Sequence, residues 1–188
     1  MLTLDASDRI GVAADTGPLL SAFQADSQAL LHRYFSGIVI VQSQLAEFEK
    51  HGAKREIQEL ISGGFVVVVK NLTDEEKATS RAIAGRIMSS PHSRDPILEH
   101  HLPESELMVV AQRVDSNCRR IFLDEKAARS IAEELGLRTS GFLGILANAG
   151  LDGLLSKEDI RRLLKICQNK GTHYKENLIE LVAQTYGR

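Results

Sequence analysis

The sequence of 188 residues has few cysteines, no long apolar run and no excess of positive charge. Its two cysteines, Cys118 and Cys167, are too few for a thiolate zinc cage or a disulfide framework. We therefore expect both to behave as small buried apolar side chains. No apolar run approaches the roughly 18 residues that a membrane-spanning helix needs. The opening MLTLDASDRI is too polar for a secretory signal, so we expect a cytoplasmic protein without a membrane partner.

The balance of charge limits the class of partner. Lysine and arginine total 23 and aspartate and glutamate total 25, which gives a formal net charge of −2. Proteins that bind nucleic acid usually carry a basic excess, so any contact with nucleic acid here must be local.

What the sequence does contain is a series of short, continuous apolar runs separated by helical patterns. Continuous runs are typical of parallel strands that helices cover on both faces. The alternation predicts an α/β fold, a three-layer α/β/α sandwich with a mainly parallel central sheet of four to five strands. The predicted strands are Ile10–Ala14, Ile38–Val41, Phe65–Val69, Arg120–Leu123 and Leu137–Thr139.

Capping residues mark several predicted helices. Ser43 precedes a helix, and Thr73 with Glu76 three residues later forms a capping box for another. Ser156 begins the first of two C-terminal helices. We assign residues 1–150 to the sandwich domain and residues 151–188 to a helical extension packed on the same domain.

One segment, Ser89–Pro103, lacks any apolar period. It is polar and holds three prolines and three histidines, so we expect a long irregular loop. Its adjacent histidines, His100 and His101, are expected to be solvated, with metal ligation the less favoured interpretation. Arg94 in the same loop is also expected to be solvated, with RNA contact as the alternative.

Four carboxylates fall at one end of this predicted fold. Asp15 directly follows the first strand, and Asp124 ends the fourth. Glu47 lies in the first turn of the helix after the second strand, and Glu104 opens the helix before the fourth. The carboxyl ends of parallel strands and the amino ends of the following helices share one rim, so we expect the four to converge.

A cluster of four carboxylates has a chemical consequence. Two of them about 4 Å apart repel by roughly 4 kcal/mol at a surface-like effective dielectric, so protons or a cation must intervene. Ligands that are all oxygen select a hard cation, Mg²⁺ or Mn²⁺. Such an ion binds a phosphodiester oxygen and lowers the pKa of a bound water. The acids therefore predict metal-dependent phosphodiester hydrolysis.

Asp15 also has other interpretations. It could simply cap the helix that follows, but capping leaves the other acids unexplained. The triplet Asp15-Thr16-Gly17 occurs in aspartic proteases, which are β-rich, whereas this chain is mostly helix-patterned. A phosphatase similar to the haloacid dehalogenases would use Asp15 as its nucleophile, but it needs a second aspartate where Gly17 stands.

The order of these motifs, from about Ile10 onward, resembles the PIN-domain ribonucleases, and among them prokaryotic proteins with two extra C-terminal helices. The resemblance implies that Asp15, Glu47, Glu104 and Asp124 are the catalytic metal ligands, supported by Thr16 and Ser140. The segments that carry it are Asp15-Thr16-Gly17-Pro18-Leu19, Ile38-Val39-Ile40-Val41, Pro103-Glu104-Ser105-Glu106, Ile121-Phe122-Leu123-Asp124-Glu125 and Thr139-Ser140-Gly141-Phe142-Leu143-Gly144.

The third acid has an alternative. Pro103 stands where the family has glycine, so Glu106 could be the ligand in place of Glu104. Helical spacing favours Glu104, because it directs Leu107 into the core and places the opening turn at the rim. Glu125, next to Asp124, is the weakest candidate and is interpreted as an acid that starts a helix.

The resemblance implies metal-dependent cleavage of single-stranded RNA, often by the toxin of a toxin/antitoxin pair, and commonly by a homodimer. An antitoxin protein is then a further expected partner. The alternative is a catalytically inactive PIN-like module that binds nucleic acid or protein. The absence of an evident basic groove in the sequence favours this alternative.

Overall fold

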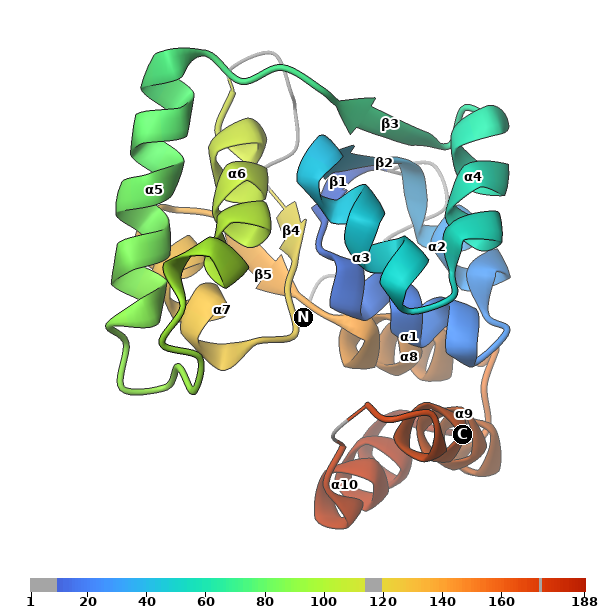
Figure 1. Ribbon diagram of the computed structural model, residues 1–188. Coiled ribbons are helices and arrows are strands. Elements are labelled where there is room, and N and C mark those ends of the chain that lie inside the picture. The colour runs from blue at the N-terminus through green and yellow to red at the C-terminus, as the bar shows by residue number, and fades with distance from the viewer. Residues whose placement is uncertain (1–9, 114–119, 173) are drawn as a thin grey trace.

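The computed structural model describes residues 10–113, 120–172 and 174–188 (Figure 1). Its strands form one sheet in the order β3-β2-β1-β4-β5, and every neighbouring pair is parallel. The predicted parallel sheet is therefore confirmed. The strands are β1 (Ile10–Ala14), β2 (Phe35–Val41), β3 (Val66–Val69), β4 (Arg120–Phe122) and β5 (Arg138–Ser140).

Helices cover both faces of the sheet, which confirms the three-layer sandwich (Figure 1). One face carries α5 (Asp74–Met88), α6 (Leu102–Ala111) and α7 (Lys126–Glu134). The opposite face carries α1 (Thr16–Gln24), α2 (Gln28–Tyr34), α3 (Leu45–Lys50), α4 (Lys54–Ser62) and α8 (Phe142–Leu151). Two short 3₁₀ helices, η2 (Gln42–Gln44) and η3 (Leu98–His101), precede α3 and α6.

Each face of the sheet has its own hydrophobic core. Along β1, Val12 and Ala14 enter the core beneath α1 and α8, whereas Ala13 enters the core beneath α6. Along β4, Phe122 belongs to the first core and Ile121 to the second. Successive side chains of a strand point to opposite faces, so burial on both faces explains why the apolar runs are continuous.

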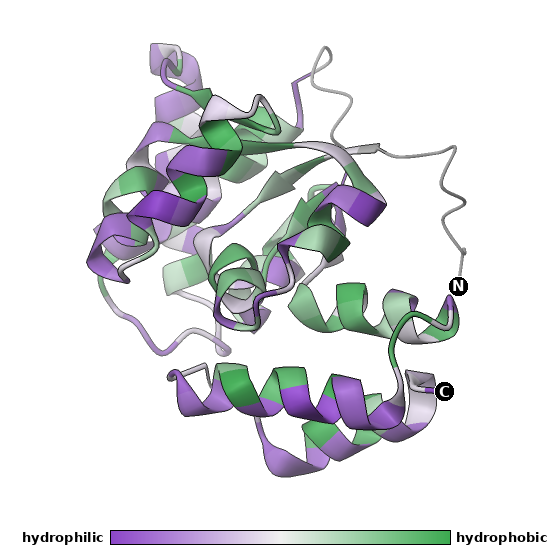
Figure 2. Ribbon diagram, turned by 90° about the vertical axis from the view of Figure 1, so that its right-hand side faces the viewer, coloured by the Kyte–Doolittle hydropathy of each residue, from purple (hydrophilic) through white to green (hydrophobic). Residues whose placement is uncertain are grey.

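The C-terminal helices α9 (Lys157–Asn169) and α10 (Glu176–Tyr186) lie beneath α1 and α8, outside the sandwich (Figures 1 and 2). The Cys167 thiol donates to the carbonyl of Ser21 at 3.3 Å, and Lys170 donates to the carbonyl of Gln24 at 2.9 Å. Cys167 is fully buried, as expected, whereas Cys118 lies outside the described residues. The domain boundary at residue 150 stays a prediction.

Two local predictions are wrong. The segment Ser89–Pro103 is not irregular to its end, because η3 occupies its last part and α6 already begins at Leu102. Pro103 lies in the first turn of α6, where a missing N–H costs nothing. Ser43 is not a helix cap: it lies within η2, and Gln44 is the N-cap residue of α3.

Other boundaries agree with the sequence pattern. Thr73 and Glu76 form the predicted capping box, and Ser156 caps α9. β2 begins at Phe35, three residues before the predicted start, because the chain passes from α2 into the strand without a turn. None of the helices in the described part of the chain is long and apolar enough to cross a membrane.

Candidate functional site

An open cavity of about 1490 Å³ lies at the carboxyl end of the sheet, and we call it the acid cavity. Asp15 follows β1, Asp124 follows β4, Glu47 lies in the first turn of α3 and Glu104 in the first turn of α6. All four line this cavity. The structure therefore brings together the acids that the sequence scatters over 110 positions.

Strand pairing explains why Asp15 and Asp124 meet. β1 pairs with β4 with Ala14 opposite Phe122, and the backbone N–H of Asp15 donates to the carbonyl of Phe122 at 2.9 Å. The chain therefore leaves both strands side by side. Asp15 occupies the N-cap position of α1, and hydrogen bonds from the backbone N–H groups of Thr16 and Gly17 act to lower the pKa of its carboxyl group, so a capping role accompanies its place at the cavity.

The Asp15 carboxylate is oriented by Gln44, a residue that the sequence analysis missed. The Gln44 amide donates to Asp15 Oδ1 at 3.2 Å and to the carbonyl of Ala14 at 3.1 Å. Its carbonyl oxygen accepts from the backbone N–H of Val41 at 2.8 Å, and the whole side chain is buried. Gln44 thus links the ends of β1 and β2 and fixes the direction of the acid.

Burial and, after it, the negative charges of Glu47 and Asp124 raise the pKa of Asp15 to about 7. Asp124 keeps some contact with solvent, but the surrounding protein raises its pKa to about 6. The nearby Arg129 guanidinium opposes this shift, as does the backbone N–H of Phe142, which donates to the Asp124 carboxylate. Without a bound cation, Asp15 and Asp124 therefore lose their protons at higher pH than ordinary aspartates do.

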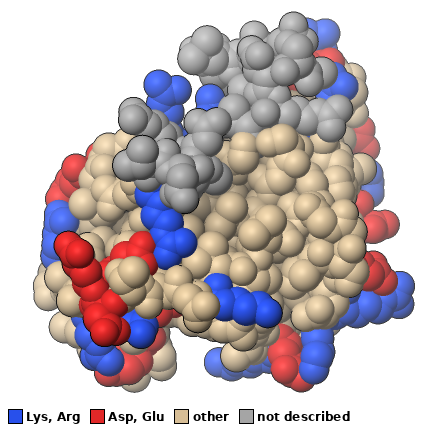
Figure 3. All heavy atoms as spheres, turned by 90° about the horizontal axis from the view of Figure 1, so that it is seen from above, with Lys and Arg blue, Asp and Glu red and all other residues tan. Residues whose placement is uncertain are grey.

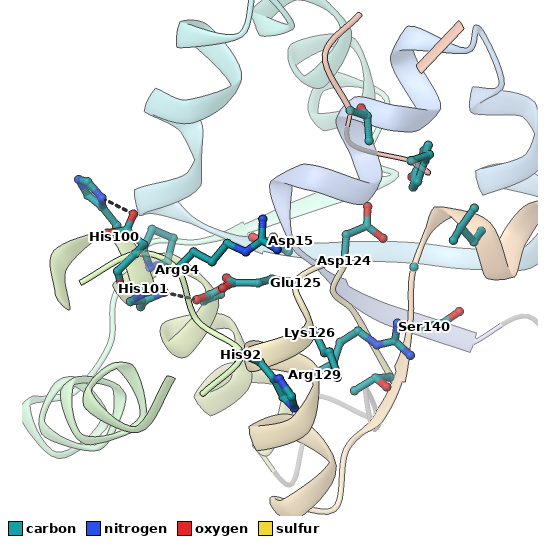
Figure 4. Close-up of a pocket in the computed structure, with 18 of the residues that line it drawn as sticks. Asp15, His92, Arg94, His100, His101, Asp124, Glu125, Lys126, Arg129 and Ser140 are labelled. Carbon is teal, nitrogen blue, oxygen red and sulfur yellow. Dashed lines mark hydrogen bonds and ion pairs between the residues drawn. The ribbon is translucent and has the colours of Figure 1, made fainter. Parts of the chain in front are cut away.

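The segment after β5 is shaped around Asp124. A Cβ at Gly141 would lie 2.2 Å from Asp124 Oδ1, so only glycine allows this approach. A Cβ at Gly144 would lie 2.3 Å from Ser140 Oγ. Ser140 itself lines the acid cavity, where the sequence placed it (Figure 4).

Glu104 is buried, with 7% of its surface exposed, and its Oε1 lies 2.8 Å from Nδ1 of His101. Nε2 of His101 lies 3.0 Å from the carbonyl oxygen of Asp95. A carbonyl only accepts, so Nε2 carries a proton, and a second proton lies between Nδ1 and Glu104. Burial raises the pKa of Glu104, as do the charges of Asp15, Glu125 and Glu47.

The expectation that both adjacent histidines are solvated is wrong for His101. The η3 turn carries it inward, and only 3% of its surface remains exposed. His100 is exposed as expected, and its Nδ1 lies 2.7 Å from Oδ2 of Asp95. The sequence signal was present but ambiguous, because a histidine three residues before an acid faces that acid only if both lie on one helical turn.

Glu125 takes a larger part in the site than the sequence suggested. It occupies the N-cap position of α7, but its carboxylate makes no capping bond and instead shares a hydrogen bond with Glu104. One ligand atom each from His101, Glu104 and Glu125 lie within 4.8 Å of one another. Figure 4 shows Glu125 pointing toward His101 across the cavity.

Glu106 is not brought to the acid cavity. Its carboxylate accepts a hydrogen bond from Ser43 Oγ at 2.6 Å and lines a separate hollow. Thr16, beside Asp15, is fully buried, and its hydroxyl has no hydrogen-bond partner among the described residues. An unpaired buried hydroxyl is costly, and here it adjoins the central acid of the cluster.

These donors fit a hard divalent cation. All four predicted ligands offer carboxylate oxygens, and raised pKa values at Asp15, Glu104 and Asp124 show that their charge is not balanced by the protein. Mg²⁺ and Mn²⁺ favour such oxygen ligands. Among the described residues, the group whose ligand atoms lie within 4.8 Å of one another is His101, Glu104 and Glu125, so Glu104 is the predicted ligand that already has partners at metal-binding distance.

Positive side chains border the acids. Arg94 is exposed, as expected, and Figure 4 shows it extending from its loop over the cavity. Lys126 and Arg129 of α7 line the side near Ser140 (Figure 4). Thr172, Tyr174, Lys175 and Leu178 line the cavity from the C-terminal helical region. The C-terminal extension is thus part of the wall of the site.

Comparison with known proteins identifies the family. A family model described as a PIN domain matches residues 11–188, which is nearly the whole chain and includes α9 and α10. Searches of curated proteins and of solved structures found no match. The PIN domain is a nuclease fold that typically uses divalent metals, in agreement with the acidic cluster. The chain belongs to the PIN-domain family.

Proposed function

We propose that the protein is a metal-dependent endoribonuclease that hydrolyses phosphodiester bonds of single-stranded RNA in the acid cavity. The observation that carries this proposal is the convergence of Asp15, Glu47, Glu104 and Asp124 in one open cavity. Carboxyl groups whose pKa values are raised by burial and by one another, such as Asp15 and Glu104, are a poor arrangement for stability alone. They suit a protein that binds a cation there.

The roles of the acids follow from their surroundings. Asp15, Glu104 and Asp124 are proposed to bind the metal directly, and Glu47 is proposed to add a further negative charge beside it. A bound Mg²⁺ or Mn²⁺ would supply charge neutralisation, polarise a phosphodiester and lower the pKa of a water. Positioning falls to Gln44 for Asp15, to the Phe142 N–H for Asp124, and to His101 for Glu104.

Protons must leave the cluster before the acids act as ligands. A hydrogen bond between the carboxyl groups of Glu104 and Glu125 requires a proton on one of them. The His101–Glu104 contact can keep its proton on Nδ1, which leaves Glu104 anionic. His101 therefore orients Glu104.

The formal net charge of −2 does not favour binding of RNA by the whole surface, but positive residues border the acid cavity. Once the acids are neutralised, Arg94, Lys126 and Arg129 leave the cavity surface favourable to a polyanion. We assign these three side chains to contacts with the RNA backbone on either side of the cleaved bond.

The proposal is tested by incubating the protein with single-stranded RNA, with Mg²⁺ or Mn²⁺ and with chelator. Cleavage should require the metal and should be lost on Asp15→Asn. Asp26→Asn is the matched control, because Asp26 is exposed and its φ of 49° suits asparagine equally well. Cleavage that ignores Asp15→Asn would contradict the proposal, and absence of divalent binding would favour the inactive module.

The cellular role is a further proposal that rests on the family resemblance. A toxin should arrest growth when it is expressed alone, and a neighbouring antitoxin should relieve the arrest. A homodimer should show as twice the chain mass in solution, and a cytoplasmic location should show on fractionation.

A further inference from the structure

A second hollow of about 360 Å³ lies near the acid cavity, at the ends of β2 and β3, and we call it the basic hollow. Lys70 follows β3, Gln42 and Ser43 follow β2, and Lys77, Ser80 and Arg81 come from α5. Leu72, Leu102 and Glu106 complete the lining.

The charge of the basic hollow is the reverse of that of the acid cavity. Its lining holds three cationic side chains and one carboxylate, whereas the lining of the acid cavity holds six carboxylates and four lysines or arginines. The one carboxylate, Glu106, already accepts a hydrogen bond from Ser43 at 2.6 Å. At formal charges, the three cations and the one carboxylate give the lining of the basic hollow a sum of +2.

The cations of the basic hollow are available. Lys70 and Arg81 are exposed and form no ion pair with any residue that the structure describes. Lys77 has a partner, Asp74, at 3.3 Å, but both side chains are exposed and such a pair contributes little. The exposed Lys70 and Arg81, beside the side-chain amide of Gln42, form a set of donors that matches a phosphate group.

The two hollows lie on either side of α6. His101, Pro103 and Glu104 line the acid cavity, while Leu102 and Glu106 line the basic hollow. The same division occurs after β2, where Ser43 lines the basic hollow and Glu47 the acid cavity. An α-helix with its side chains is about 10 Å across, so one extended strand of nucleic acid could reach both hollows.

Lysine and arginine side chains also occur outside the basic hollow. On the face seen from above, lysine and arginine side chains outside the grey residues are scattered around a broad area without charge (Figure 3). The lining of the basic hollow is positive, although the formal net charge of the chain is −2.

We propose that the basic hollow is a phosphate subsite, which holds a backbone phosphate of the same RNA strand that is cleaved in the acid cavity. The inference rests on the proposed function, and it assigns Lys70 and Arg81 as the main contacts. It also gives the strand a path across the amino end of α6. A substrate too short to reach from the acids to Lys70 and Arg81 gains nothing from the basic hollow.

The test compares two double variants of the full chain. One combines Lys70→Ala with Arg81→Ala, and the matched control combines Lys54→Ala with Arg55→Ala. The control removes the same two residue types from α4, outside both hollows. Binding of a fluorescent single-stranded oligoribonucleotide is measured against salt concentration in an Asp15→Asn background, which prevents cleavage. Thermal unfolding of both double variants confirms that they fold.

The Lys70/Arg81 variant should bind more weakly, and the slope of log affinity against log salt should become shallower by about 0.7, because the subsite holds one phosphate and each single-strand phosphate contact contributes roughly 0.7. With Asp15 restored, KM for a long RNA should rise while kcat stays within about twofold. Cleavage of a trinucleotide should change little.

An unchanged slope in a variant that still binds RNA would overturn the subsite and leave the nuclease proposal standing. An equal loss in the control would show general electrostatics and would also overturn it. If the unmodified chain shows no metal-dependent cleavage of RNA, the nuclease proposal is contradicted, and the subsite proposal, which rests on it, is contradicted as well.

Discussion

The acid cavity and the basic hollow lie at the same end of one sheet but carry opposite charge. Asp15 and Asp124 follow the central strands β1 and β4, whereas Lys70 follows β3 at the sheet edge. Burial, followed by repulsion from neighbouring acids, raises the pKa of Asp15, while Lys70 and Arg81 are exposed. The difference indicates two kinds of ligand. The clustered carboxylates of the acid cavity favour a bound cation, whereas the exposed Lys70 and Arg81 of the basic hollow can contact a phosphate group.

The largest expected effect comes from neutralising one carboxylate in each hollow. Glu47→Gln should lower the cleavage rate by about 10²- to 10³-fold, because it removes charge that holds the metal. Glu106→Gln should instead strengthen RNA binding slightly, since it removes the one negative side chain of the basic hollow. Initial rates and titrations measure both. Glu49→Gln, on the same helix as Glu47 and exposed, should match the unmodified chain.

Positioning residues of the acid cavity should rank second. His101→Ala should lower activity or metal affinity by about 10- to 100-fold, as expected for a residue that orients a ligand. If His101→Ala weakens metal binding, the variant should need a higher metal concentration for half-maximal cleavage, whereas misfolding would lower the rate at every metal concentration. His100→Ala is the control, because His100 is exposed and contacts Asp95 rather than an acid of the cluster. Equal losses in the two variants would contradict the assigned role.

Metal should stabilise the fold in a pH-dependent way. The pKa values of Asp15 and Asp124 lie near 7 and 6 in the folded protein but near 3.8 when unfolded, so the folded form binds more protons between these limits. Stability of the metal-free protein should therefore fall as pH rises from about 4 to 7 and then level off. At 100 times its Kd, Mn²⁺ should raise Tm by about 5–10 °C at pH 8.

The same addition should shift Tm much less at pH 5, where the acids hold their protons. Differential scanning calorimetry with and without chelator makes the comparison. A shift that is equal at both pH values would mean that Mn²⁺ binds elsewhere.

The smallest expected effect concerns Thr16. Its hydroxyl is buried without a partner among the described residues, so Thr16→Val should stabilise the metal-free chain by about 1 kcal/mol. Chemical denaturation measures this change. Cleavage should weaken if the hydroxyl serves the site. Destabilisation by Thr16→Val would show that the hydroxyl has a partner in solution.

Much of the fold could be predicted because each strand is a short apolar run with its own boundaries. The acids that follow β1 and β4 were found for the same reason, since a strand end fixes where the next side chain lies. The choice between Glu104 and Glu106 required only the helical phase of α6. The position of a residue along a helix or strand depends on its sequence neighbours, so the local sequence pattern can predict it.

Gln44 and His101 could not be found in this way. Gln44 matters because it joins the ends of two paired strands, and His101 because η3 turns it under Glu104. The basic hollow likewise joins residues from β2, β3, α5 and α6 that share no sequence motif. Each of these depends on which elements pack together.

The sequence by itself determined the order of strands and helices, the two-faced burial of the sheet and the four acids, because these follow from local periodicity and from chain direction. Only the tertiary structure decided which side chains hold those acids, how far their pKa values move, and where positive charge gathers beside them. These properties depend on distances between residues remote in sequence, which packing alone sets.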